Sequence, residues 1–88
     1  MKISVWDTYV TRDDSSIMHF DILVPDSVQD SEKVFEYGRA YLKRKSVVSE
    51  DISSEVCKFC HIEEASETVT EEVKKHGFYV VELKNCGV

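Results

Sequence analysis

Two thiols and an imidazole occur within five consecutive residues, Cys57-Lys58-Phe59-Cys60-His61. Thiolate sulfur and imidazole nitrogen are common ligands of Zn²⁺, and a structural zinc site takes four ligands in a tetrahedron. Cys57, Cys60 and His61 would supply three of them, and either Cys86 or His19 would supply the fourth. This pattern predicts a metal site, with zinc as the first choice of metal.

The same segment allows three other interpretations. Cys57 and Cys60 can be small buried side chains of a strand, with His61 hydrogen-bonded at the surface. Cys-x-x-Cys-His is also the attachment signature of c-type haem, but haem is attached outside the cytoplasm, and the first two dozen residues lack the pattern of an export signal. A thiol–disulfide site favours a helix N-terminus, whereas residues 62–65 are expected to separate Cys60 from the next helix.

A second group of side chains that could do chemistry is expected on one face of a hairpin. His19 and Asp21 are two residues apart in an alternating segment, so they share a face, and Asp7 can lie across from them on the preceding strand. Two carboxylates and an imidazole could act in acid–base chemistry or bind a metal ion. A solvated sheet face with a cross-strand pair would show the same pattern, and no nucleophile can be assigned beside it.

The spacing of apolar residues predicts the elements that position these groups. Residues 17–24 alternate most clearly, because Met18, Phe20, Ile22 and Val24 fall on one face. The expected elements are strands at 2–10 and 17–24, a helix at 31–45, a connection at 46–54, a strand at 55–62, a helix at 66–76 and a strand at 78–83. This order, β-β-α-β-α-β, predicts an α+β fold: one two-layer domain spanning residues 1–88, in which a mixed four-stranded sheet has both helices on one face.

Local signals predict where the two helices begin and end. Asp30 or Ser31 can cap the first helix, because their side chains can accept a hydrogen bond from its first turn. Thr68 and Glu71 have the spacing of a capping box near the start of the second helix. Gly77 is expected to end that helix, since glycine adopts the left-handed conformation without a side-chain clash.

Two helices on one face would leave the other face of the sheet uncovered. An apolar residue there, such as Leu23 or Trp6, would be exposed in a monomer, and a symmetric homodimer would cover it. Long side chains and the connection at 46–54 could cover the same face instead.

Composition narrows the classes of partner and location. The chain has 88 residues with 17 acidic and 11 basic side chains, so its net charge of -6 opposes binding to nucleic acid. Polar residues interrupt every apolar run before it reaches the length of a membrane span, so no membrane association is expected. Three cysteines are an odd number, which fits free or metal-bound thiols in a reducing compartment and predicts a cytoplasmic protein.

An ordered set of short motifs covers nearly the whole chain. They are Asp7-Thr8-Tyr9-Val10, Met18-His19-Phe20-Asp21, the segment from Cys57 to His61, and Gly77 followed by an aromatic strand and Cys86. With these motifs the chain resembles a family of small uncharacterised bacterial proteins that carries a domain-of-unknown-function label. The resemblance implies a domain of two helices and four strands and adds no mechanism. Asn85 stands where members of the family tend to have glycine, which weakens any fixed role for Cys86.

These observations together predict a small cytoplasmic binding module. It would bind a metal ion, with zinc first, through the cysteine and histidine cluster, or it would bind a protein partner. The alternative is a thiol- or metal-dependent enzyme that uses Cys57, Cys60 and His61 together with His19 and Asp21.

Overall fold

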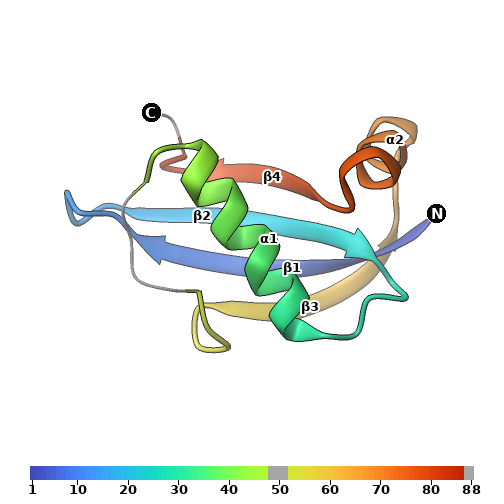
Figure 1. Cartoon of the computed structure of the whole chain (residues 1–88), viewed down its shortest axis with the longest axis horizontal. Coiled ribbons are helices and arrows are strands. Elements are labelled where there is room, and N and C mark those ends of the chain that lie inside the picture. The colour runs from blue at the N-terminus through green and yellow to red at the C-terminus, as the bar shows by residue number, and fades with distance from the viewer. Residues whose placement is uncertain (48–51, 87–88) are drawn as a thin grey trace.

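The computed structural model describes residues 1–47 and 52–86 and has the element order that the sequence predicts (Figure 1). The elements are β1 (Lys2–Thr11), β2 (Ile17–Pro25), α1 (Ser31–Arg44), β3 (Cys57–Glu64), α2 (Glu67–His76) and β4 (Tyr79–Lys84). The α+β class is therefore confirmed, and each boundary lies within two residues of its predicted position. Part of the predicted connection at 46–54 lies outside the described residues. Among the described helices, none is long and apolar enough to cross a membrane.

The four strands form one antiparallel sheet in the order β3-β1-β2-β4, with β1 and β2 at its centre. β3 pairs with the outer side of β1, and β4 pairs with the outer side of β2, both in antiparallel orientation. Strands that run in the same direction are therefore never neighbours. The sheet is antiparallel, and the prediction of a mixed sheet was wrong in this detail.

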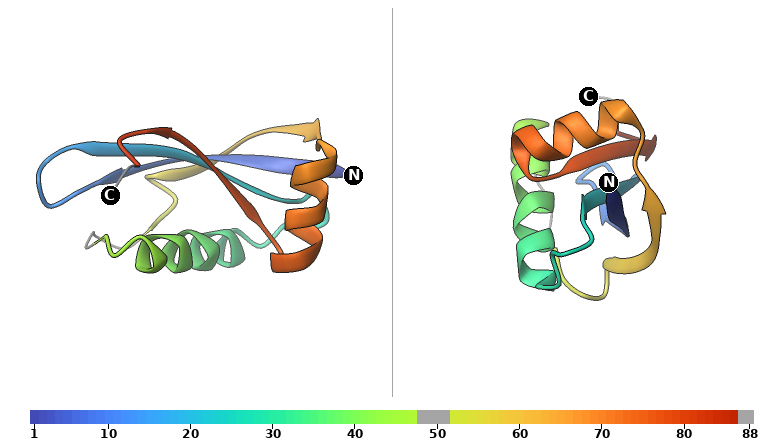
Figure 2. Two further views of the ribbon diagram at one scale, coloured as in Figure 1. Left: turned by 90° about the horizontal axis from the view of Figure 1, so that it is seen from above. Right: turned by 90° about the vertical axis from the view of Figure 1, so that its right-hand side faces the viewer.

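One face of the sheet packs against α1 and forms the main core, as the left view of Figure 2 shows. The alternating side chains of β2 on this face are completely buried, as predicted; they are Met18, Phe20, Ile22 and Val24. Asp30 caps α1 by accepting a hydrogen bond from the backbone N–H of Glu32 at 3.0 Å. Gly38 lets α1 lie close to the side chain of Ile52, because a Cβ at this position would lie 2.4 Å from Cδ1 of Ile52.

The second helix does not lie beside α1. Figure 1 shows α2 almost end-on at the corner where β4 begins, and Figure 2 shows it standing beside the end of the sheet. Its residue Val69, together with Ala65, packs against buried Ile3, Val5 and Leu23 on the face opposite α1. The prediction that both helices share one face is therefore wrong, because the apolar stripe of α2 serves the other face.

The ends of α2 match one predicted signal and not the other. Ser66, and not the predicted capping box at Thr68 and Glu71, caps the helix by accepting a hydrogen bond from the N–H of Val69 at 3.2 Å. Gly77 ends the helix in the left-handed conformation with a φ of 89°, as expected.

The predicted exposure of Leu23 and Trp6 is also wrong. Leu23 is only 5% exposed, since α2 and the segment before it cover that end of the sheet. Trp6 lies on the α1 face, where it is half-buried and contacts Phe59 edge to face. The homodimer stays a prediction, but these two residues no longer support it.

Candidate functional site

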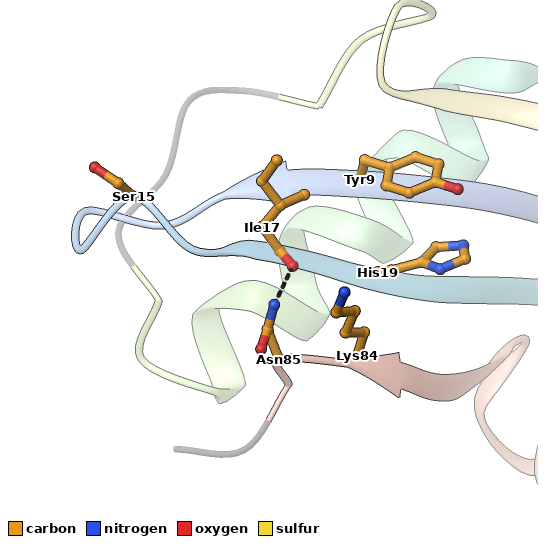
Figure 3. Close-up of a pocket in the computed structure, with 6 residues that line it drawn as sticks. All are labelled: Tyr9, Ser15, Ile17, His19, Lys84 and Asn85. Carbon is orange, nitrogen blue, oxygen red and sulfur yellow. Dashed lines mark hydrogen bonds between the residues drawn. The ribbon is translucent and has the colours of Figure 1, made fainter.

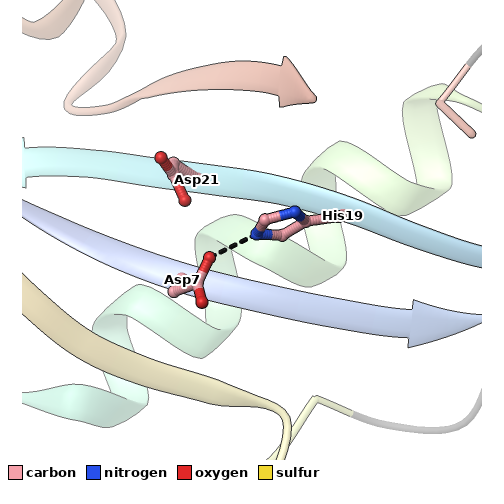
Figure 4. Close-up of side chains that lie close together, drawn as sticks. All are labelled: Asp7, His19 and Asp21. Carbon is pink, nitrogen blue, oxygen red and sulfur yellow. Dashed lines mark hydrogen bonds and ion pairs between the residues drawn. The ribbon is translucent and has the colours of Figure 1, made fainter. Parts of the chain in front are cut away.

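A polar cluster occupies the face opposite α1, just beyond the apolar contacts of α2. Asp7 of β1 and Asp21 of β2 are directly paired across the ladder, and His19 is the next residue of β2 on the same face. Figure 4 shows the three side chains converging above the two central strands. We call Asp7, His19 and Asp21 the trio. The structure brings these three predicted site residues together.

The geometry of the trio is that of a small ligand set. One ligand atom from each of its side chains lies within 4.8 Å of the others, and all three residues are half-buried. Nε2 of His19 contacts a carboxylate oxygen of Asp7 as a hydrogen bond and, when the imidazole is protonated, as an ion pair. The exposed fractions of the His19 and Asp7 side chains are 26% and 36%, so a solvent ion can reach the cluster.

Neighbouring side chains orient the trio. The ring of Tyr9 stacks on the imidazole of His19, with centroids 4.2 Å apart and planes inclined by 8°. On the other side of β1, the register pairs Asp7 with Lys58 and pairs Val5 with His61. The trio therefore lies between an aromatic ring and the basic side chains of an edge strand.

The environment of Asp21 disfavours its ionised form. The pKa of Asp21 is raised, first by burial and then by its hydrogen bond and charge interaction with Asp7, while His19 and His61 act in the opposite direction. The pKa of Tyr9 is raised mainly by the negative charge of Asp7. Negative charge is thus concentrated at the trio, and a cation placed there would relieve the repulsion.

The predicted cysteine and histidine cluster does not form a ligand set. Among the described residues, the trio is the group of three or more metal-binding side chains that comes together. Cys57 is buried in the core on the α1 side, where its sulfur accepts a hydrogen bond from Oγ1 of Thr8 at 3.3 Å. Burial is the main cause that raises the pKa of the Cys57 thiol, which disfavours the thiolate that a metal ligand requires.

Cys60 and His61 lie at an irregularity of the edge strand β3. Trp6 pairs with Phe59 and the preceding Val5 pairs with His61, so Cys60 is an extra residue in the ladder. Cys60 is exposed, and its sulfur lies 3.2 Å from Nδ1 of His61. Nε2 of His61 instead contacts Glu63 at 2.7 Å.

Cys86, the predicted fourth ligand, is also separate from the other thiols. It is buried in the main core after β4, and its sulfur is 3.4 Å from the backbone oxygen of His19 and 3.3 Å from that of Lys84. Cys86 thus helps to hold β4 against β2 behind the trio.

A shallow hollow of about 560 Å³ adjoins the trio at the hairpin end of the sheet (Figure 3). His19 belongs to both the trio and the hollow. The hollow is lined by Tyr9, Ser15, Ile17, His19, Lys84 and Asn85. Sequence reasoning missed all of these except His19, although the alternation of β1 already placed Tyr9 on the face of Asp7.

Comparison with known proteins agrees with the resemblance seen in the motifs. Residues 1–83 match the family described as Domain of unknown function (DUF2024). The chain belongs to this family. It is similar to the NMR structure of protein NE1680 from Nitrosomonas europaea, with 34% sequence identity, a TM-score of 0.87, and coverage of 99% of this chain and 100% of that chain. No curated protein matches the chain.

Proposed function

We propose that this member of the DUF2024 family binds a divalent transition-metal ion through Asp7, His19 and Asp21. The observation that carries the proposal is the convergence of three ligand atoms within 4.8 Å on the two central strands. In this proposal the ligands of the metal ion are one nitrogen and two oxygens. They take the place of the predicted set of Cys57, Cys60, His61 and Cys86.

The ligand types suit a first-row metal, with zinc as the first one to test. Imidazole is a common ligand of zinc, iron, copper and nickel, and zinc also takes carboxylate oxygens. Three protein ligands leave at least one position of a tetrahedral zinc ion for water or another molecule. A site of this kind would hold the metal and keep it accessible.

Electrostatics supports binding of a cation in preference to an empty cluster. Burial and the neighbouring Asp7 raise the pKa of Asp21, which means that ionised Asp21 is disfavoured in the folded protein. A divalent cation favours the ionised form of both carboxylates and the neutral form of His19. Metal binding is therefore expected to release protons and to weaken as the solution becomes acidic.

The surroundings of the trio would limit the reorganisation that binding requires. Asp7 and Asp21 project from paired residues of the central strands, and the ring of Tyr9 stacks on His19. A ligand set held by a regular ladder loses less conformational freedom on binding than one held by a loop. These contacts support a preformed site.

The test is zinc binding by untagged protein from which metal has been stripped with a chelator. Calorimetric titration should give one zinc ion per chain, with proton release. Asp21→Asn should weaken zinc binding by at least about tenfold, because it removes a charged ligand. Asp13→Asn removes the same charge from an exposed turn position and should leave zinc binding unchanged.

The thiol cluster supplies the opposing outcome. Cys60→Ser and His61→Asn, made together, should leave zinc binding at the trio unchanged. If this double variant abolishes zinc binding while Asp21→Asn retains it, or if the wild-type protein takes up neither zinc nor manganese, the proposal fails.

The cytoplasmic location is part of the same proposal. Cys57, Cys60 and Cys86 are free thiols, and two of them are buried. Free thiols in a small domain fit a reducing compartment. Fluorescence microscopy of the tagged protein in its native cell would test the location.

A further inference from the structure

We propose that the hollow beside the trio binds a small organic anion, in which a phosphate or carboxylate group is attached to a flat apolar group. This inference goes beyond metal binding, because it rests on Lys84, Tyr9 and Ile17, which are not metal ligands. It applies to the metal-free protein as well.

The hollow has a lysine in its lining, while the carboxylate of Asp7 contacts His19 from the side of the trio. Its lining includes the ammonium group of Lys84 and the imidazole of His19 but no acidic side chain, although the whole chain has a net charge of -6. Within the described part of the chain, Lys84 forms no ion pair. A cation left unpaired in an acidic protein attracts an anion to that position.

The polar side of the hollow is held by contacts between the hairpin and the end of β4. Nδ2 of Asn85 donates a hydrogen bond to the backbone oxygen of Ile17 at 2.8 Å, as Figure 3 shows. The backbone oxygen of Asn85 in turn accepts a hydrogen bond from Arg12 at 3.1 Å. Arg12 therefore helps to hold the end of β4 against the hairpin, while Ser15 supplies a hydroxyl group at the turn.

The remaining wall is apolar and exposed to solvent. Tyr9 is 47% exposed and Ile17 is 51% exposed, so two of the large hydrophobic side chains that this protein leaves in water line this one hollow. Ligand sites combine apolar walls with a few polar groups that fix orientation. The pairing of Tyr9 and Ile17 with Lys84 therefore selects a ligand that has both a flat apolar part and a negative charge.

The direct test uses phenyl phosphate as the probe and chelator-treated, ¹⁵N-labelled protein. Titration followed by NMR should give saturable shifts at the residues that line the hollow. Inorganic phosphate carries the charge without the ring, and benzyl alcohol carries the ring without the charge. Each should bind at least about tenfold more weakly than phenyl phosphate, since each lacks one half of the interaction.

Two lysine variants separate a specific site from general attraction. Lys84→Met should weaken binding of phenyl phosphate about tenfold, because it removes the ammonium and keeps the length of the side chain. Lys43→Met makes the same change in charge on α1, which packs on the opposite face, and should leave the affinity unchanged. Both side chains are exposed, and the NMR spectra report directly whether each variant is folded.

A third variant tests the apolar wall. Tyr9→Leu should weaken phenyl phosphate more than inorganic phosphate, because only the former has a ring to contact. Equal weakening by Lys84→Met and Lys43→Met, or shifts confined to residues outside the hollow, would overturn the inference. Lys84→Met should still bind zinc, because Lys84 is not one of the proposed metal ligands. A protein that binds zinc but not phenyl phosphate would overturn this inference and leave the metal proposal standing.

Discussion

Replacing Asp21 by Asn should stabilise the metal-free protein near neutral pH while it removes a metal ligand. The amide has almost the same shape as the carboxylate, so the change mainly removes one charge. Ionised Asp21 is disfavoured in the fold by burial and by Asp7, which is why its pKa is raised above the ordinary value of 3.8. The variant therefore removes an unfavourable contribution of ionised Asp21 to the stability of the wild-type protein.

The distance between the carboxylates sets the size of the effect. Two unit charges 4.8 Å apart, the upper limit of spacing within the trio, repel by about 0.9 kcal/mol in water and by about 3.5 kcal/mol at an effective dielectric constant of about 20. Partial exposure and the opposite charge available from His19 place the net effect near the lower figure. A gain of about 1 kcal/mol should raise the melting temperature by about 4 to 8 °C in a domain of this size.

The dependence on pH follows from the raised pKa of Asp21. Protonated Asp21 carries no penalty, so the wild type and Asp21→Asn should be equally stable below the ordinary pKa of 3.8. As the pH rises through the raised pKa of the folded protein, the wild type loses stability relative to the variant. The advantage of the variant should be complete above that range.

Thermal unfolding followed by circular dichroism, with chelator present, measures this difference across the acidic and neutral range. Asp13→Asn is the matched control, since it changes the net charge equally at an exposed position. Saturating zinc should reverse the order: about 100-fold excess over the wild-type dissociation constant adds about 2.7 kcal/mol to the wild type, but only about 1.4 kcal/mol to a variant that binds about tenfold more weakly. A metal-free Asp21→Asn variant that is less stable than wild type at neutral pH would refute the electrostatic reasoning.

Three further predictions concern the scaffold. Glu82→Gln should lower the free energy of unfolding in urea by about 1 kcal/mol at neutral pH, because Glu82 accepts a hydrogen bond from Tyr41 at 2.5 Å and pairs with Lys45 at 2.7 Å. The pKa of Glu82 is lowered, mainly by the hydrogen bond from Lys45, so the difference should vanish as the pH falls through that lowered pKa. A loss that persists in acid would contradict this. Gly77→Ala should cost about 1 to 2 kcal/mol in the same assay, because φ is 89° and the new Cβ would lie 2.8 Å from a tyrosine hydroxyl; an unchanged midpoint would show that the turn relaxes. Cys57→Ala should cost about 1 to 3 kcal/mol as a core truncation without altering the response of the melting temperature to chelator; a changed chelator response would bring the thiol back as a ligand.

The fold was predictable where the sequence carries a local signal. The alternation from Met18 to Val24 identified β2 and its buried face, and Asp30 and Gly77 marked helix ends. The position of α2 carries no such signal. Periodicity predicts that Val69 lies on an apolar stripe, but it does not say which face of the sheet the stripe will contact.

The candidate site was predictable to the same extent. His19 and Asp21 share a face because strands have a period of two, and a hairpin with its turn near residues 12–16 places Asp7 beside them. The prediction of a thiol cluster was wrong because the spacing of residues in the sequence does not fix the direction of their side chains at a bulge. The side chain of Cys57 is buried in the core. The extra residue, Cys60, then shifts the register of β3 and is exposed, so the two sulfurs do not share a site.

The placement of the trio explains why this protein can keep two carboxylates and an imidazole on its central strands. α2 covers the end of that face that carries Ile3, Val5 and Leu23, and the trio beyond it is half-buried. If both helices packed on the face of α1, the apolar end of the opposite face would need another cover. If α2 extended over the whole opposite face, the charges of Asp7 and Asp21 would be buried without opposite charges to compensate them. Half-coverage keeps the trio on a rigid ladder and within reach of ions, which is the combination that binding at this face requires.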